Sequence, residues 1–229
     1  MIAMCGLAWN GLVHSKRWLE SVRNNADGHD VKLFLIDNGS MDGTYELFQS
    51  HNPEFLLRQP GNLSIYIAWN RLLREAAARN PDLIVLSNND LVVGPGWIDA
   101  ALREGRKPTF RDFLPNGNVG GNMDTFDADV RAALPELSPV AIGPARAGWF
   151  LMFKPSCLDI FLPIPEELVL WYGDDYIHTK LQEAGYVCES ILDCCVKHAG
   201  SQTVFQRADF HEVIKRDREI FKRIMGWAP

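Results

Sequence analysis

The sequence predicts an α/β fold in which helices flank a mostly parallel, Rossmann-like central sheet. Over the first hundred residues, short apolar runs alternate with segments of helical spacing, which is typical of strand–helix–strand units. The runs are continuous rather than alternating, as expected for strands buried on both faces. Some of the hydrophobic stretches lead directly into polar or acidic residues, which a buried strand could carry only at a large desolvation cost. We therefore expect these polar groups at the carboxyl ends of strands, where open α/β sheets bind ligands.

The first half of the chain has the clearest pattern. Asn10-Gly11 ends the first apolar run, and Pro60-Gly61-Asn62 turns the chain after the third. The expected strands cover residues 2–9, 31–36, 55–57 and 83–90. The expected helices cover residues 15–22, 42–48, 65–78 and 95–103.

The pattern weakens between Gly105 and Pro144, where only two strands are expected, near residues 118–123 and near residue 140. Beyond it we expect strands at 151–153 and 187–196, a helix at 176–184 closed by Gly185, and an amphipathic helix at 210–224. Asp174 and Asp175 are expected on a loop before the first of these helices.

The composition is that of an ordinary globular protein. The chain has 229 residues, of which 47% are hydrophobic and 23% charged, enough for one domain of generous size. A net charge of −6 gives no support for a general nucleic-acid or anionic-membrane binder, and leaves only a local basic patch open. No apolar run reaches the ~18 residues of a membrane-spanning helix, and the amino terminus does not resemble a signal peptide. We expect a cytoplasmic protein.

The five cysteines are best explained as reduced thiols. Cys188, Cys194, Cys195 and His198 cluster, but their spacing matches none of the usual paired zinc patterns. The adjacent Cys194 and Cys195 would also point to opposite faces of a strand. Buried thiols are therefore favoured over a zinc site.

The apolar run from Ile84 ends in three polar residues, Asn88, Asn89 and Asp90. Asp90 offers a hard oxygen ligand of the kind that Mg²⁺ or Mn²⁺ takes alongside substrate phosphates. This indicates the metal and diphosphate corner of an enzyme. A plain turn after a strand is the alternative, because Asn and Asp also favour turns.

Three further groups could carry chemistry. Asp37, on the same sheet edge, could accept hydrogen bonds from a base or a ribose. Asp174 or Asp175 could act as a general base on a hydroxyl. His198 follows the last strand, although a lone histidine is more often structural than a ligand.

Several motifs occur in an order that is typical of one enzyme family. The run from Asp37 to Thr44 is similar to the second-strand signature of glycosyltransferase family 2, whose members have the GT-A fold. The resemblance covers residues from about 2 to 200 and continues through Trp9-Asn10-Gly11, Asn62 and Asn70, Leu86 to Asp90, Pro95-Gly96-Trp97, Gly148 to Phe153, Gly173-Asp174-Asp175 with Ala184-Gly185-Tyr186, and His198. Because the motifs follow one another in the family's order, the chain is identified as a member.

The resemblance implies an inverting transfer of a hexosyl or deoxyhexosyl group from a nucleotide-diphosphate sugar (UDP-, GDP- or dTDP-linked) to a hydroxyl. By this resemblance, Asp90 and His198 would hold Mn²⁺ or Mg²⁺, since the leaving diphosphate gains negative charge. The nucleotide sugar would be bound by Ala8, Trp9, Asn10, Asp37, Asn38, Asn62, Asn70, Asn88 and Asn89.

On the acceptor side, the resemblance assigns the base to Asp174, with Asp175 as the second candidate. The acceptor would be bound by Gly148, Trp149, Trp171 and Tyr172. The resemblance also divides a single domain, 1–229, into a nucleotide-sugar half (1–104), an acceptor half with a small mixed sheet (105–200) and a helical tail (201–229).

The sequence departs from the family's pattern at several positions. Ala8 stands in place of a frequent proline, Ser64 in place of a glycine, and Asn88 in place of the first acid of the metal motif. Tyr176 and Lys180 stand where another acid and an arginine are frequent. These departures leave the sugar and the exact base open, but not the reaction class.

Three questions stay open at the level of sequence. A nucleotide-sugar-binding module without turnover is an alternative of another class. A saccharide or glycoconjugate is the expected acceptor, and a hydroxylated DNA base or a protein, in the host cytoplasm for a phage or viral enzyme, is the alternative. A nucleic acid would be bound only as the acceptor substrate. This hypothesis is favoured by the basic residues of the last helix: Lys215, Arg216, Arg218, Lys222 and Arg223. The oligomeric state is not indicated.

Overall fold

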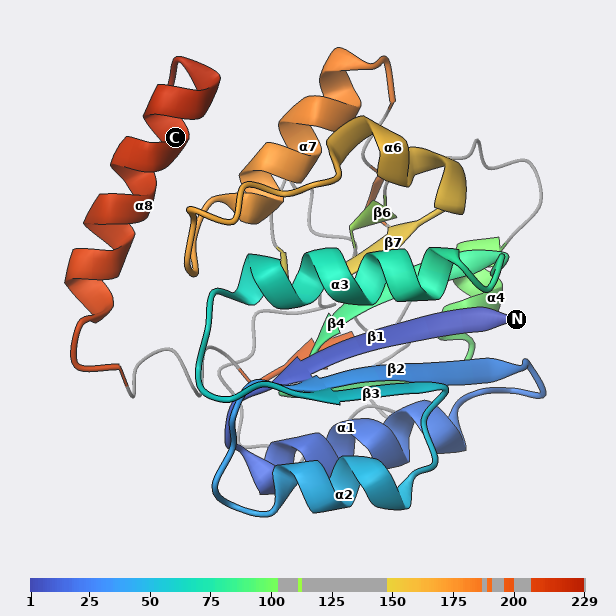
Figure 1. Cartoon of the computed structure of the whole chain (residues 1–229). Helices are drawn as coiled ribbons and strands as arrows, with labels where there is room; N and C mark the ends of the chain where they lie inside the picture. Colours follow the sequence, from blue (N-terminus) through green and yellow to red (C-terminus); the bar gives the residue numbers. More distant parts are fainter. Residues whose placement is uncertain (103–110, 113–147, 187–188, 191–195, 200–206, 229) are drawn as a thin grey trace, which may run out of the picture.

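The computed structural model confirms the predicted α/β fold (Figure 1). It describes residues 1–102, 111–112, 148–186, 189–190, 196–199 and 207–228. The strands are β1 (Ile2–Ala8), β2 (Val31–Asp37), β3 (Phe55–Arg58), β4 (Leu83–Asn88), β5 (Leu91–Val93), β6 (Arg111–Asp112), β7 (Phe150–Phe153), β8 (Glu189–Ser190) and β9 (Val196–His198).

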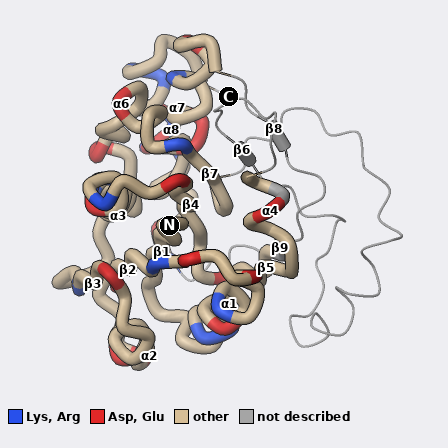
Figure 2. Tube along the Cα trace, turned by 90° about the vertical axis from the view of Figure 1, so that its right-hand side faces the viewer, with Lys and Arg blue, Asp and Glu red and all other residues tan. Residues whose placement is uncertain are grey.

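Among the described residues, β1 lies inside a seven-stranded sheet with the order β3-β2-β1-β4-β7-β6-β8 (Figure 2). β1 pairs in parallel with β2 and with β4, whereas β7 joins β4 antiparallel. The register places Ala8 opposite Asp37 and Leu7 opposite Asn88. The carboxyl ends of β1 and β4 therefore form a topological switch point, where open α/β sheets hold ligands. The strand ends that carry Asp37 and Asn88 share this edge, as predicted.

Helices cover both faces of the sheet, with α3 on one face and α1 and α2 on the other (Figure 1). A separate two-stranded antiparallel sheet, β5-β9, lies beyond β4 within the described part of the chain. The helices are α1 (Leu12–Asn24), α2 (Thr44–Ser50), α3 (Ile65–Ala77), α4 (Trp97–Leu102), the 3-10 turn η2 (Pro155–Cys157), α6 (Leu158–Phe161), α7 (Gly173–Glu183) and α8 (Phe210–Met225).

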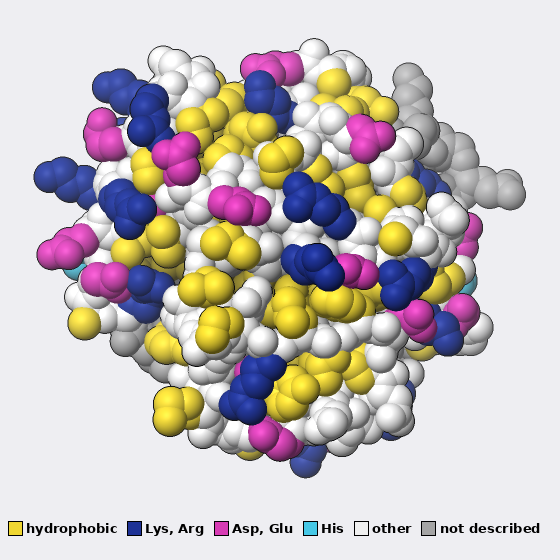
Figure 3. Space-filling view, viewed as in Figure 1, with side chains coloured by type: hydrophobic (Ala, Val, Ile, Leu, Met, Phe, Trp, Pro, Cys, Tyr) yellow, Lys and Arg dark blue, Asp and Glu magenta, His cyan; other side chains and the backbone are white. Residues whose placement is uncertain are grey.

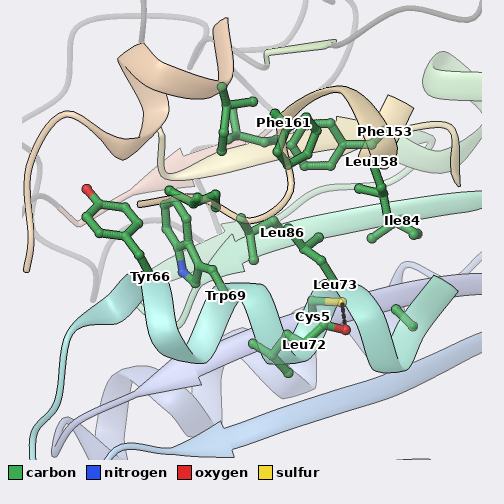
Figure 4. Close-up of a cluster of buried hydrophobic side chains, with 14 of the residues drawn as sticks. Cys5, Tyr66, Trp69, Leu72, Leu73, Ile84, Leu86, Phe153, Leu158 and Phe161 are labelled. Atoms are coloured by element: carbon green, nitrogen blue, oxygen red, sulfur yellow. Dashed lines mark hydrogen bonds between the residues drawn. The ribbon is translucent and has the colours of Figure 1, made fainter. Parts of the chain in front are cut away.

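The core is divided by the sheet into two apolar clusters. On one side, α3 buries one face at intervals of three and four residues, as an amphipathic helix must. Figure 4 shows this cluster, in which residues of α3 contact side chains of β4, β7 and α6: Tyr66, Trp69, Leu72, Leu73, Ile84, Leu86, Phe153, Leu158 and Phe161. On the other side, Trp18 of α1 is fully buried with Phe48 of α2.

The structure changes three details of the prediction. α1 begins at Leu12 rather than at residue 15, and Asp174 and Asp175 lie in the first turn of α7 rather than on a loop before it. The short α6 and η2 and the short strands β5 and β6 were not predicted. The strands expected near 118–123 and 140, and the cysteines at 188, 194 and 195, lie outside the described residues. Cys5 and Cys157 are free and buried.

The surface carries charges of both signs. Figure 3 shows Lys and Arg side chains mingled with Asp and Glu over the face that it presents, with apolar side chains between them. On α8, Arg223 forms an ion pair with Glu167. No described helix is both long enough and apolar enough to cross a membrane.

We predict that Gly6→Ala destabilises the fold, because a β-carbon at this position would lie 2.1 Å from Trp18 Cη2. Overpacking of this kind usually costs about 1–3 kcal/mol, measurable as a lower midpoint in urea unfolding. Gly61→Ala is the matched control, since nothing lies within 4 Å of a β-carbon there. Equal midpoints for the two variants would contradict the close contact between β1 and α1.

Candidate active site

A cavity of about 380 Å³ opens at the carboxyl edge of the sheet. It brings together eleven of the residues predicted for the site: Trp9, Asn38, Asn62, Asn88, Asn89, Asp90, Gly148, Trp149, Trp171, Asp174 and His198. The other predicted residues do not line it: Ala8, Asn10, Asp37, Asn70, Tyr172 and Asp175. The cavity thus brings together side chains that lie far apart in the sequence, from Trp9 to His198.

Asp90 and His198 are brought together by the β5-β9 pair. Leu91 pairs with His198 across the two strands, and the Ala199 N–H donates to the Asp90 carbonyl oxygen at 2.9 Å. The Asp90 Oδ1 atom lies 3.1 Å from His198 Nε2. Trp149 stacks on the imidazole, with ring centroids 5.1 Å apart and planes at 17°. The histidine ring is therefore fixed from two sides.

These two side chains fit a divalent cation. Asp90 Oδ1 and His198 Nε2 are both buried, and neither makes a hydrogen bond within the described residues. Buried polar atoms normally find a partner, so this pair is suited to a ligand that satisfies both. No group of three or more His, Cys, Asp or Glu side chains suited to a metal forms in the described part of the chain. Two protein ligands suit a cation that completes its shell with water and substrate phosphates.

Asn10 and Asp37 build the loop beside the cavity. The Asn10 N–H donates to Ser40 Oγ at 2.7 Å, and Asn10 Oδ1 accepts the Met41 N–H at 3.0 Å. Asp37 is fully buried, and both its carboxylate oxygens lie 3.2 Å from the Ser40 nitrogen. Arg58 Nε lies 3.4 Å from Asp37 Oδ2. Both predicted residues therefore shape the turn after β2 in this structure.

Asn38 joins that turn to the segment before α3. Its amide nitrogen donates to Asn62 Oδ1 at 2.9 Å and to the Leu63 carbonyl at 3.0 Å, and its oxygen accepts the Leu63 N–H. Gly39 permits the approach, because a β-carbon there would lie 2.6 Å from Gly61 Cα. Asn38 and Asn62 thus form one polar wall of the cavity.

Asn70 and Tyr172 have structural partners elsewhere. Asn70 donates to the Ile164 carbonyl at 2.9 Å and accepts the Ile164 N–H at 2.8 Å, which fixes the chain after α6. Tyr172 lies against Phe221 of α8, with ring centroids 5.5 Å apart. Ala8 is buried in the core beneath the sheet edge.

Asp174 lies in the first turn of α7, where the helix dipole favours a negative charge. Gly148 contacts it so closely that a β-carbon at residue 148 would lie 2.7 Å from Asp174 Cβ. Burial, and then the neighbouring charge of Asp175, raise the pKa of Asp174 to about 6, against the lowering effect of backbone hydrogen bonds that include one from Gly148. A carboxyl group with such a pKa is suited to accept a proton near neutral pH.

Sequence reasoning missed several residues of the cavity wall. Tyr66 and Trp69 line it from α3, where their helical spacing indicated only core packing. Arg207 also lines it, held by a bidentate pair with Asp209 at 2.8 and 2.9 Å. Arg207 stands alone between unpatterned residues, so the sequence carried no signal for it.

We predict that Asp174→Asn stabilises the protein at pH 7.5. An unfolded Asp titrates near 3.9, whereas the folded pKa is about 6, so the native state binds the extra proton between these values. Stability from this group is therefore present at low pH and lost as the pH rises through about 6. Thermal unfolding should show a higher midpoint for the variant at pH 7.5. The difference should vanish at pH 4, and a constant difference would contradict the raised pKa.

Solved glycosyltransferase structures share this fold. Mannosyltransferase PcManGT from Pyrobaculum calidifontis, solved with GDP-Man and Mn²⁺, is 16% identical with a TM-score of 0.64, and the match covers 100% of this chain and 65% of that chain. The chain therefore spans just under two thirds of that protein's length.

Two further structures match over nearly the whole chain. Glucosyl-3-phosphoglycerate synthase from Mycobacterium tuberculosis, solved with phosphoglyceric acid, is 18% identical over 96% of this chain and 79% of that one, with a TM-score of 0.59. S. aureus TarS 1–349 is 12% identical over 99% of this chain and 72% of that one, with a TM-score of 0.61. At these identities the likeness concerns the fold.

The sequence itself places the chain in a family. No curated protein matches it. The family model described as "Glycosyl transferase family 2" matches residues 16–149, which is more than half of the chain and includes the strand ends that carry Asp37 and Asp90. The chain belongs to glycosyl transferase family 2.

Proposed function

We propose that the protein is a metal-assisted, inverting glycosyltransferase that moves a sugar from a nucleotide-diphosphate sugar to an acceptor hydroxyl. One observation carries the proposal: Asp90 and His198, which lie 3.1 Å apart and make no hydrogen bond through these atoms within the described residues, line the same cavity as Asp174, whose pKa is raised. Such a transfer needs a site for a divalent cation and a general base that face the same cavity.

Asp90 and His198 would hold Mn²⁺ or Mg²⁺ at the diphosphate end. A bound divalent cation would stabilise the negative charge that the leaving diphosphate gains. The chain's own contribution is to fix the ligands: strand pairing holds Asp90 and His198, and the Trp149 stack sets the ring plane. Asn88 and Asn89 adjoin them, and Asn89 is anchored to Ser15 Oγ at 2.9 Å.

Asp174 would act as the base. It would take the proton of the acceptor hydroxyl while that oxygen forms a bond to the sugar's anomeric carbon. The bond from that carbon to the diphosphate oxygen breaks, and its electron pair leaves with the nucleoside diphosphate. Attack on the face opposite the leaving group inverts the configuration. Asp175, next in the chain, raises the pKa of Asp174 and is the supporting charge.

The donor would lie along Trp9, Asn38 and Asn62, between the turn after β2 and the start of α3. Solved proteins of this fold carry GDP-Man or UDP with Mn²⁺, which supports a nucleotide-diphosphate sugar without selecting one.

The acceptor would contact the aromatic part of the cavity, formed by Trp149 and Trp171, beside Gly148, which lies against Asp174. The indole N–H of Trp171 is buried without a hydrogen-bond partner in the described residues, so it could donate to an acceptor hydroxyl. Flat aromatic faces with a few donors suit a saccharide ring.

The direct test is a thermal-shift panel of UDP-, GDP- and dTDP-sugars, each with Mn²⁺ and with chelator. A ligand at 100 times its dissociation constant adds about 2.7 kcal/mol of stability. We expect one donor to raise the unfolding midpoint only when Mn²⁺ is present. No shift with any donor would contradict the proposal.

Two substitutions should separate binding from turnover. Asp90→Ala should abolish the Mn²⁺-dependent shift, because it removes a ligand of the cation corner. Asp174→Asn should keep that shift but lower donor hydrolysis by about 10²–10⁴-fold, the usual contribution of a general base. Nucleoside diphosphate release measures hydrolysis, with the exposed Asp159→Asn as the control.

The pH profile gives a further check on the base. Hydrolysis by the wild type should fall about tenfold for each pH unit below about 6, because Asp174 becomes protonated there. A profile without this limb, or full turnover by Asp174→Asn, would point to a different base. Tight donor binding without any turnover in the wild type would instead support a binding module.

A further inference from the structure

Asp217 of α8 has a fully buried carboxylate in a helix whose charged residues otherwise suggest a solvated surface. It accepts the backbone N–H groups of three consecutive residues. The Val169 nitrogen lies 3.1 Å from both carboxylate oxygens, and the Leu170 and Trp171 nitrogens lie 2.8 and 2.9 Å from Oδ2. Successive N–H groups that converge in this way form an anion-binding nest. Here the anion is supplied by the chain itself.

The segment held by Asp217 is a wall of the cavity. Val169, Leu170 and Trp171 all line it. The same segment is held from the opposite side by the start of α3, because Ser64 Oγ donates to the Leu168 carbonyl at 2.6 Å and the Ile65 N–H donates to the Val169 carbonyl at 3.0 Å. Figure 1 shows the chain ahead of α7 passing between α3 and α8.

The segment 169–171 is followed closely in the sequence by Asp174, the proposed base. Tyr172 follows with a left-handed backbone (φ 69°), and the Gly173 N–H then donates to Tyr66 Oη at 3.0 Å. Only glycine fits at residue 173, since a β-carbon there would lie 1.9 Å from the Tyr66 ring. Asp174 comes next. Only Tyr172 and Gly173 separate residue 171 from Asp174, so a displacement of residues 169–171 would strain the backbone that begins α7.

A carboxylate is the group that suits this position. Hydrogen bonds to an ionised acceptor are about twice as strong as neutral ones, and three partly buried N–H groups that lost their common acceptor would be costly. An amide of the same shape, with its oxygen at the Oδ2 position, would lose the charge and would turn its N–H₂ group toward the Val169 N–H, which lies 3.1 Å from both carboxylate oxygens of Asp217. The N–H groups of residues 169–171 thus need the Asp217 carboxylate as their acceptor, and the buried carboxylate needs them as its donors.

We propose that Asp217 is a positioning residue for the reaction: through the backbone of residues 169–171 it fixes the acceptor wall and the approach of Asp174 to the cavity. This inference rests on the proposed function, because it names the residue that places the wall and the base of that same site. Asp217 does not touch the reacting atoms.

The test compares wild type with Asp217→Asn in the full-length protein. The probe is the member of the UDP-, GDP- and dTDP-sugar panel that the wild type hydrolyses fastest with Mn²⁺. We expect turnover at saturating donor to fall at least about tenfold, since a misplacement of 1 Å can cost about 100-fold. The KM for the donor should stay within about twofold, because Asp217 contacts none of the donor residues. Amide hydrogen exchange should accelerate at residues 169–171 but not at 83–93.

Three variants complete the design. Glu219→Gln makes the same change of charge on an exposed position of α8 and should behave as wild type. Val213→Ala removes buried apolar volume from the same face of α8 but keeps the Asp217 carboxylate, and should lower the unfolding midpoint while keeping turnover. Asp217→Glu keeps a carboxylate and should restore part of the turnover. It also decides the matter where Asp217→Asn does not fold.

Several outcomes would overturn the inference. Turnover and exchange of Asp217→Asn equal to those of Glu219→Gln would show that the contact is dispensable. An equal loss of turnover in Val213→Ala would reduce the effect to general stability, and a loss without faster exchange at 169–171 would remove the proposed route. Hydrolysis of no donor by the wild type would instead contradict the proposed function, and exchange would still decide whether Asp217 holds the wall.

Discussion

The parallel register of β1 with β2 and β4 is the constraint on which the rest of the structure depends. Where these strands are buried on both faces, unpaired polar groups are costly in their interior, and Asp37 and Asn88 lie at the strand ends. Because Ala8 faces Asp37 and Leu7 faces Asn88, the ends coincide. The turn after β2, the asparagines at the end of β4 and Asp90 therefore meet at one edge of the sheet, and the strand register alone is enough to bring them together. The rest of the chain has only to bring His198 and Asp174 to that edge.

Much of this edge could be predicted because its signals are local. A continuous apolar run followed by Asn88, Asn89 and Asp90 identifies a strand end from the chain alone, and the order of the family's motifs extends the assignment to His198 and Asp174. The structure adds how these residues are held. Asn10 and Asn38, expected to meet the nucleotide, fix the turns beside the cavity through hydrogen bonds that no local pattern encodes.

The remaining features could not be predicted, because their partners are backbone groups far away in the sequence. Asp217 looked like one charge among many on a basic helix, and Asn70 like a family asparagine beside the donor. Each instead holds a distant segment through main-chain atoms, Asp217 at residues 169–171 and Asn70 at Ile164. Backbone donors are the same at every residue, so a sequence gives no sign of which segment a buried side chain will bind.

If the cavity binds an acceptor as proposed, the contact between Asp217 and residues 169–171 bears on how its specificity could change. Asp217 holds Val169, Leu170 and Trp171 by their peptide groups, not by their side chains. The side chains that face the cavity can therefore be exchanged while the main chain keeps its path. The backbone of this segment would stay in place while its side chains vary. Libraries that vary these three positions should therefore sample new acceptors without losing the alignment of Asp174. In natural sequences, drift in substrate range would be expected to concentrate there.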